Sequence, residues 1–269
     1  MNGQQLIEAL RSGRQVYGTL IVSPSPFWPA RVKQLGLDLV FIDTEHIPLD
    51  RSMVAWMCQT YTALELAPVV RIPSPDPFQA QMVLDGGAAG VIVPYIESAE
   101  QVLTLAGAIK WGPLKGQKLR GILDQQAEAE PELADYLAER AARKAFIVNI
   151  ESVPAVQALD DILSGPYVDA VLIGPHDLSC SLGIPEQYDH PDFDAAVRTI
   201  IRTARAHGVG VGIHIDSIEQ EIAWSQAGAN LIMHSSDIVS FLNRLTEDFG
   251  RIRSGLHDER KTSAEQVNI

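Results

Sequence analysis

In Leu39-Val-Phe-Ile-Asp-Thr-Glu-His46, a short apolar run ends abruptly in two acids and a histidine. Gly36 precedes the run, and a helical pattern follows it from Leu49 to Glu65. A short, continuously apolar run between such neighbours is typical of a strand buried in a parallel sheet. Its polar residues then lie at the carboxyl end of the strand, where α/β barrels keep their catalytic groups.

The same pattern recurs further along the chain. Arg71 closes the run Pro-Val-Val-Arg, Glu151 closes Phe-Ile-Val-Asn-Ile-Glu, and Asp177 lies just beyond Val-Leu-Ile-Gly-Pro. Because the carboxyl ends of parallel barrel strands meet at one rim, we expect His46, Arg71, Glu151 and Asp177 to lie together there.

Strand and helix patterns alternate along the whole chain. After a helix at 3–13, strands are predicted at 16–22, 39–43, 68–72, 90–96, 146–150, 170–174, 209–215 and 231–233. Helices are predicted at 26–35, 49–65, 76–86, 98–110, 131–144, 154–163, 193–206, 217–228 and 238–253, with Asp76, Ser98 and Ser217 as N-caps and capping boxes at the two serines. Residues 112–130 show no clean periodicity.

Eight strand–helix units in about 250 residues match the size of a (β/α)8 TIM barrel. The fold class predicted is therefore α/β, a (β/α)8 TIM barrel with an N-terminal helix. An open doubly wound sheet is disfavoured, because no Gly-rich fingerprint follows the first strand. We expect one barrel domain over residues 1–255 and a disordered tail at 256–269.

Composition restricts the partners and the compartment. The net charge is −13 and the pI about 4.9, and no cluster of Lys and Arg is present, which argues against nucleic acid. No apolar window reaches the roughly 18 residues of a membrane helix, and the start lacks a signal peptide. With Cys58 and Cys180 far apart, neither a disulfide framework nor a cysteine metal site is implied. A reduced, cytoplasmic location is expected.

Glu151 and Asp177 are the candidate metal ligands. Carboxylates at the ends of neighbouring strands can share a hard divalent cation, Mg²⁺, Mn²⁺ or Co²⁺, with water or substrate oxygens completing an octahedron. The alternative is that each carboxylate only caps the helix that follows it.

His46 and Arg71 are the candidates for acid–base chemistry and anion binding. A carboxylate near an imidazole raises its pKa toward neutrality, and both Asp43 and Glu45 lie close to His46 in sequence. A strand-end guanidinium needs a carboxylate partner, which for Arg71 is Asp43, Glu45 or a substrate acid. Every lysine falls away from a strand's carboxyl end, which disfavours a Schiff-base aldolase.

These motifs resemble, in order, those of the HpcH/HpaI family of metal-dependent pyruvate aldolases. The resemblance runs over about residues 3–250. The motifs that carry it are Asp43-Thr-Glu-His46, Pro68-Val-Val-Arg71, Val93-Pro94, Arg120-Gly121, Glu151-Ser152, Ile173-Gly-Pro-His-Asp-Leu-Ser179-Cys-Ser-Leu-Gly183, Gly228-Ala-Asn230 and Asp237.

The resemblance implies a fold, an assembly and a set of roles. It implies a (β/α)8 barrel, commonly in hexamers that exchange C-terminal helices, with Glu151 and Asp177 holding the metal. Pyruvate would chelate that metal, which acts as a Lewis acid on the developing enolate. Arg71 would bind the enolate, and His46 with Asp43 would form the acid–base dyad.

Several positions depart from the usual family pattern. Leu20 stands where an aromatic residue is frequent, and Asn149 where a Gln often precedes the metal-binding Glu. His176 replaces a common Ala, and His214 replaces an apolar residue on the aldehyde side. Substrate-binding candidates are therefore Arg71, Asn149, Gly174, Pro175, His176 and His214, and His214 is expected to add a hydrogen-bond donor.

Three functions follow as hypotheses. The first is a divalent-metal aldolase that cleaves a 4-hydroxy-2-oxo acid to pyruvate and an aldehyde. The second is an oxaloacetate decarboxylase or another reaction through a pyruvate enolate. The third, from a different class, is a barrel that binds small acids without turnover. The partners expected are a 2-oxo acid, an aldehyde and further copies of the chain, as a trimer or hexamer.

Overall fold

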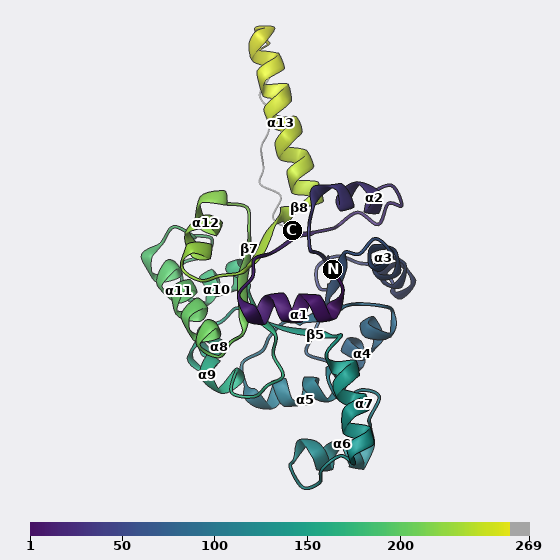
Figure 1. Cartoon of the computed structure of the whole chain (residues 1–269). Helices are drawn as coiled ribbons and strands as arrows, with labels where there is room; N and C mark the ends of the chain where they lie inside the picture. Colours follow the sequence, from purple (N-terminus) through teal and green to yellow (C-terminus); the bar gives the residue numbers. More distant parts are fainter. Residues whose placement is uncertain (259–269) are drawn as a thin grey trace.

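The eight strands of the chain form a closed, parallel barrel in chain order, as the computed structural model, which describes residues 1–258, shows (Figure 1). The strands are β1 Val16–Leu20, β2 Leu39–Asp43, β3 Ala67–Arg71, β4 Gly90–Val93, β5 Ala145–Ile150, β6 Ala170–Ile173, β7 Gly210–Ile215 and β8 Leu231–Ser236. The predicted (β/α)8 barrel with an N-terminal helix is thus confirmed.

Helices surround the barrel. They are α1 Gly3–Ser12, α2 Pro29–Val32, the 3₁₀ helix η1 Lys33–Leu35, α3 Arg51–Ala63, α4 Pro77–Asp85, α5 Ala99–Ile109, α6 Gly116–Leu123, α7 Pro131–Ala141, α8 Val153–Gln157, α9 Leu159–Ile162, α10 Pro175–Ser181, α11 Pro191–Ala206, α12 Ile218–Gln226 and α13 Asp237–Gly255.

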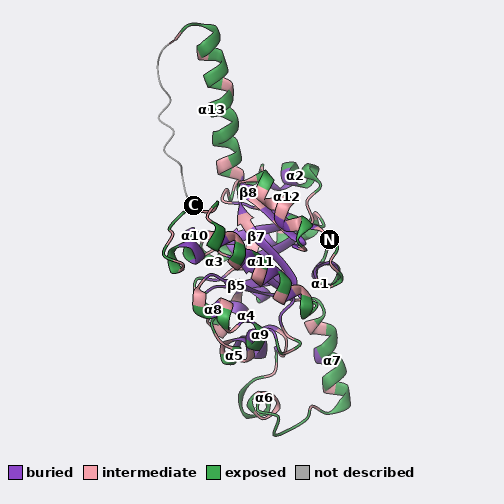
Figure 2. Ribbon diagram, turned by 90° about the vertical axis from the view of Figure 1, so that its left-hand side faces the viewer, coloured by how far each residue is buried: buried purple, intermediate pink, exposed green. Residues whose placement is uncertain are grey.

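Alternation along each strand divides the apolar side chains into two clusters. Leu39 and Phe41 of β2 belong to the cluster inside the barrel, whereas Val40 and Ile42 pack outward against the helices. Strands β2 to β6 are buried on both faces, as their purple colour in Figure 2 shows, whereas β1 exposes Tyr17. By this period of two, Asp43 continues the inward row, and the register pairs it with Arg71.

Helix α1 closes the amino-terminal end of the barrel (Figure 1). Its buried Leu6 and Leu10 join the inner cluster. Its approach is so close that a Cβ on Gly3 would lie 2.0 Å from the carbonyl oxygen of Arg143. Arg11 then pairs at 2.9 Å with the buried Asp169, which also accepts from Lys110. The opposite, carboxyl end is where the polar strand ends gather.

The prediction of an irregular segment at 112–130 is partly wrong, because helix α6 occupies part of this segment. Helix α6 packs Leu119 and Leu123 beside Gly107 of α5, a long-range contact that a local pattern does not reveal. The single helix expected at 154–163 is instead the two short helices α8 and α9. Helix α10 was not predicted, and strand β8 continues three residues beyond the expected end, to Ser236.

The predicted N-caps are confirmed in detail, with one correction. Asp76 and Ser98 accept backbone N–H groups of the helices that follow, and Ser98 forms a full capping box with Gln101. Ser217 caps the N–H of Gln220. The side-chain amide of Gln220 donates to the loop at Tyr188 and Asp189, and the side chain does not accept the N–H of Ser217, so the second capping box is wrong.

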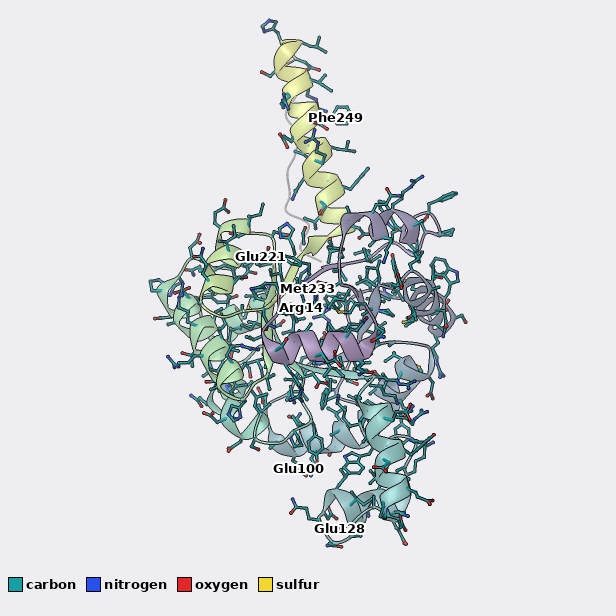
Figure 3. All side chains as sticks on the ribbon, viewed as in Figure 1. Arg14, Glu100, Glu128, Glu221, Met233 and Phe249 are labelled. Atoms are coloured by element: carbon teal, nitrogen blue, oxygen red, sulfur yellow. The ribbon has the colours of Figure 1, made fainter. Side chains whose placement is uncertain are left out.

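Helix α13 extends away from the barrel (Figures 1 and 2) and contains no buried residue. Phe249 projects from it at a distance from the barrel body (Figure 3). Of the tail expected to be disordered, residues 256–258 are described and the remainder lies outside the described residues.

Candidate active site

The ends of β2 and β3 place a buried ion pair at the carboxyl rim. Arg71 donates through Nε and Nη2 to Oδ1 and Oδ2 of Asp43, at 2.8 and 2.7 Å. Burial alone disfavours charge on both groups, but their mutual hydrogen bonds and charges lower the pKa of Asp43 and raise the pKa of Arg71. Both residues are therefore charged at neutral pH, and the guanidinium is held in one orientation.

Glu45 is a second carboxylate that lies beside Arg71. Its Oε2 lies 3.2 Å from Arg71 Nε and 3.8 Å from Nε2 of His46. Asp43 accepts the backbone N–H of His46, and the charge of His46 also acts on Asp43. Arg71 and two backbone N–H groups use the oxygens of Asp43, and the His46 side chain is 52% exposed, so the acid–base dyad of His46 with Asp43 stays a prediction.

Glu151, just after β5, is buried and points at the same rim. Its Oε1 accepts the N–H of Tyr95 at 2.8 Å and its Oε2 accepts from the side chain of Asn149 at 3.0 Å. Burial raises the pKa of Glu151, the two hydrogen bonds oppose this, and the charges of Asp177 and Glu45 add to the rise. A Cβ on Gly174 would lie 2.8 Å from Oε2, so glycine at this position leaves room for the carboxylate.

Asp177 lies in the first turn of α10 and is exposed. Its charge acts on both Glu151 and Tyr95, which places it at the same rim. Within residues 1–258 no group of three or more His, Cys, Asp or Glu side chains is arranged to hold a metal. Two carboxylates nonetheless suit a cation such as Mg²⁺, which keeps several waters or substrate oxygens.

A metal ion would also suit the local charge and polarity. The charges of Glu45 and Asp177 raise the pKa of Glu151, and all three carboxylates raise the pKa of Tyr95, so a cation would relieve this repulsion. The buried Oδ1 of Asn149 has no hydrogen-bond partner among the described residues. The donor set is made of oxygens, as hard divalent cations prefer.

Sequence reasoning missed Tyr95, directly after Pro94 at the end of β4. Its φ is 57°, in the left-handed region, which lets its N–H reach Glu151 while its hydroxyl bonds Glu45. The Glu45 contact is the main cause that raises the pKa of Tyr95 to about 12. A positive φ is set by the tertiary contacts and has no signal in this sequence.

The other substrate-binding candidates are distributed around α10. Gly174 is the N-cap of this helix and Pro175 its first residue. His176 is exposed, and its Nδ1 lies 3.6 Å from Oε1 of Glu186. The structure brings Gly174 into contact with Glu151, whereas His176 pairs at the surface.

His214 enters the rim from β7. Its Nε2 lies 2.8 Å from the carbonyl oxygen of Ser235, and its ring meets the ring of Phe41 edge-on at 5.7 Å. Burial lowers the pKa of His214, with the charge of Arg71 acting in the same direction. The ring is therefore neutral at neutral pH.

These groups make a barrel mouth in which the fixed guanidinium of Arg71 lies beside several carboxylates. The profile of the HpcH/HpaI aldolase/citrate lyase family matches residues 22–243. The chain belongs to this family. The predicted resemblance is confirmed, and with it a carbon–carbon lyase of the aldolase type. The HpcH/HpaI aldolases are divalent-metal-dependent enzymes, in agreement with the oxygen donors at the rim.

Individual relatives of this HpcH/HpaI chain extend over nearly its whole length. The 2-keto-3-deoxy-L-rhamnonate aldolase of Shigella sonnei (strain Ss046) is 29% identical over 256 residues, covering 94% of each chain. A family protein of Burkholderia cenocepacia J2315 has a crystal structure that matches with a TM-score of 0.80 and 27% identity, covering 93% of this chain and 99% of the other.

A citrate synthase, SbnG, matches equally well in structure. Its TM-score is 0.80 at 26% identity, with 93% of this chain and 98% of the other covered. The fold is thus used by enzymes with different named reactions. In the described part of the chain, no helix has the length and apolar character needed to cross a bilayer.

Proposed function

We propose that this protein is a divalent-metal-dependent aldolase that cleaves a 4-hydroxy-2-oxo acid to pyruvate and an aldehyde. The observation that carries the proposal is the convergence of Arg71 and Glu151 at the barrel mouth, where the charge of Glu151 helps to keep Arg71 protonated. A 2-oxo acid can then lie with its anionic oxygens between a fixed guanidinium and a cation site.

Glu151 and Asp177 would hold the cation, Mg²⁺, Mn²⁺ or Co²⁺. When bound, the cation would supply Lewis-acid stabilisation of negative charge on the oxygens of the 2-oxo acid. Asn149 and the Tyr95 N–H orient Glu151 by their hydrogen bonds, and Gly174 leaves it space. Such fixed partners reduce the reorganisation needed when the ion and the substrate enter.

Arg71 would bind the carboxylate or enolate of the pyruvate half. Asp43 accepts hydrogen bonds from Nε and Nη2 of Arg71. Nη1 of Arg71 has no partner among the described residues. The anchored guanidinium therefore presents its remaining edge for a substrate oxygen. His46, exposed beside Glu45, would take the proton of the C4 hydroxyl during cleavage.

The named substrate of the Shigella relative, 2-keto-3-deoxy-L-rhamnonate, is a 2-keto acid. A substrate of that chemical class would suit this site, with the keto acid end at Arg71 and the cation. Pro175 and His176 at the start of α10, together with His214, would line the other half of the substrate.

A second candidate reaction is decarboxylation of oxaloacetate. The observation that favours it is that the His46 side chain is half exposed, so the proton-transfer half is held less firmly than the pyruvate half. Decarboxylation needs enolate stabilisation but no base at C4.

One assay distinguishes these reactions. Pyruvate release is measured with Mg²⁺, Mn²⁺ or Co²⁺ on a panel of 4-hydroxy-2-oxo acids and on oxaloacetate. Cleavage of a hydroxy-oxo acid with the highest kcat/KM supports the aldolase, and turnover of oxaloacetate alone supports the decarboxylase. Binding of 2-oxo acids with no pyruvate release from any of them would contradict both.

We also propose that the protein assembles into a trimer or hexamer through α13. The exposed apolar residues Phe241, Leu245 and Phe249 form one stripe on this helix. Beside β1 and α12 lies a groove that exposes Tyr17, Ile218 and Ile222. Two uncovered apolar surfaces on one chain suit each other in a neighbouring copy.

Light scattering of the full chain tests this assembly. Phe241→Glu with Leu245→Glu should reduce the mass to that of a monomer, while Glu247→Gln on the polar side of α13 should leave it unchanged. A monomeric wild-type chain would contradict the proposal.

A further inference from the structure

The backbone of Tyr95, at the carboxyl end of β4, is fixed at both of its polar groups. Its N–H donates to Oε1 of Glu151 at 2.8 Å, and its carbonyl oxygen accepts from Nε2 of Gln101 at 3.1 Å. Gln101 is itself held, because its Oε1 accepts the N–H groups of Glu97 and Ser98. The φ of Tyr95, 57°, is therefore imposed by its surroundings.

The side chain of Tyr95 extends from this fixed backbone to Glu45. Its hydroxyl donates to the carboxylate of Glu45. A residue other than glycine is uncommon at a positive φ, and such residues gather at functional sites. Glycine would adopt this conformation without strain, so the backbone alone does not explain why a tyrosine stands here.

Glu45 is buried, with 8% of its side chain exposed, and it lies between three groups. Besides the Tyr95 hydroxyl, its Oε2 lies 3.2 Å from Nε of Arg71 and 3.8 Å from Nε2 of His46. A separation of 3.8 Å is too long for a hydrogen bond, but a positively charged ring at that distance forms an ion pair. The contact therefore becomes favourable when the ring of His46 gains a proton.

The ring of His46 gains that proton in the proposed cleavage step. The C4 hydroxyl proton passes to the ring while the C3–C4 bond breaks. The electron pair of that bond enters the enolate of pyruvate, and the C4 oxygen becomes the aldehyde oxygen. A carboxylate already fixed beside the ring stabilises the new positive charge with little reorganisation, and it does so more strongly in the transition state than in the ground state.

We propose that Tyr95 is a positioning residue for this proton transfer: its hydroxyl holds the Glu45 carboxylate where it stabilises the protonated ring of His46. The inference rests on the proposed aldolase function. Arg71 does not fix Glu45 by itself, because its Nε and Nη2 already donate to Asp43. Tyr95 supplies the second anchor of the carboxylate.

A double-mutant cycle with His46 tests this role. Pyruvate release from 4-hydroxy-2-oxopentanoate with Mn²⁺ is measured for the wild type, Tyr95→Phe, His46→Ala and the double variant. Tyr95→Phe should lower kcat about 10-fold when His46 is present and less than about 2-fold in the His46→Ala background. An equal loss in both backgrounds would overturn the role, because a merely structural effect does not need the His46 ring.

The division of the effect between kcat and KM is a second readout. Holding Glu45 for a charge that appears only during cleavage should change kcat and leave KM and Mn²⁺ affinity at their wild-type values. A raised KM with unchanged kcat in Tyr95→Phe would overturn the proposal, because the hydroxyl would then act on substrate binding.

Tyr95→Gly separates the side chain from the backbone. Glycine adopts a φ of 57° freely and keeps the N–H for Glu151 and the carbonyl for Gln101. We expect kcat to fall at least as far as in Tyr95→Phe. Tyr136→Phe on α7 is the matched control, since its side chain is exposed to a similar extent, 49% against 53%. Wild-type cleavage by Tyr95→Gly would overturn the proposal.

The outcomes separate this inference from the proposed function. If the wild-type enzyme releases pyruvate from a 4-hydroxy-2-oxo acid but the losses of Tyr95→Phe and His46→Ala are additive, the role of Tyr95 alone is overturned. Absence of pyruvate release from every such acid overturns the aldolase proposal, and the role of Tyr95 with it.

Discussion

Arg71 holds both carboxylate oxygens of Asp43 in a two-pronged hydrogen bond, with Nε and Nη2 at 2.8 and 2.7 Å. The pair is buried at the rim, with side-chain exposures of 15% for Arg71 and 1% for Asp43. A planar guanidinium can make this contact and still direct another edge at a ligand, whereas an ammonium cannot.

Arg71→Lys should therefore reduce kcat/KM by about 10² to 10³, the cost of losing one such charge-assisted contact to a developing anion. Steady-state pyruvate release measures the loss, and circular dichroism confirms folding. Arg31→Lys on α2 is the control. Kinetics like those of wild type in Arg71→Lys would remove Arg71 from the site.

Glu151→Gln and Asp177→Asn should each weaken binding of Mn²⁺ by about 10-fold or more, because a neutral amide oxygen is a poorer ligand for a hard cation. Isothermal titration with Mn²⁺ measures this directly. Chelation of metal from the wild-type enzyme should abolish activity, and added Mn²⁺ should restore it. Unchanged Mn²⁺ affinity in both variants would refute the assignment of these ligands.

His46→Ala should slow cleavage of a 4-hydroxy-2-oxo acid by about 10² to 10⁴, the usual contribution of a general base. Decarboxylation of oxaloacetate needs no base at C4 and should be spared. The ratio of the two rates, measured on one preparation, is the readout. Equal losses in both reactions would instead indicate that His46 acts on the pyruvate half or on the fold.

Tyr95→Phe should lower turnover by about 10-fold, since it removes a hydrogen bond to the charged Glu45. The variant keeps the backbone N–H that bonds Glu151, so Mn²⁺ affinity should not change. Tyr136→Phe on α7 is the matched control. A large loss of Mn²⁺ affinity in Tyr95→Phe would show that the Tyr95 hydroxyl supports the metal site and does not act through Glu45.

Titration of His234 should account for part of the change in stability with pH. Its Nδ1 lies 2.9 Å from Oε2 of Glu221, and this contact raises the pKa of His234 above 6.5. The stabilisation is therefore complete below pH 6.5 and is lost as the pH rises through the higher, folded-state pKa. The thermal unfolding temperature of His234→Gln should fall less over that pH window than that of the wild type. His257→Gln is the control. Identical curves of unfolding temperature against pH for His234→Gln and the wild type would contradict this prediction.

Most strands and the rim were predictable because they depend on local patterns. Runs such as Leu39 to Ile42 are continuously apolar, and the next residue ends each run with a charge. Parallel topology then brings Asp43, Arg71 and Glu151 to one edge by geometry alone. The N-caps at Asp76 and Ser98 were predictable for the same reason, because a cap side chain accepts an N–H only two or three residues away.

What the sequence by itself determined, then, is the barrel, its closed order of strands and the residue types that its carboxyl rim receives. The tertiary structure decided how those residues pair: Asp43 with Arg71, His46 with Glu45, and Tyr95 with both Glu45 and Glu151. It also decided that His214 bonds the carbonyl oxygen of Ser235 and that α13 leaves the barrel. The physical reason is range: periodicity and capping depend on neighbours in the chain, whereas a long-range hydrogen bond, a positive φ or an ion pair depends on atoms that only folding brings together.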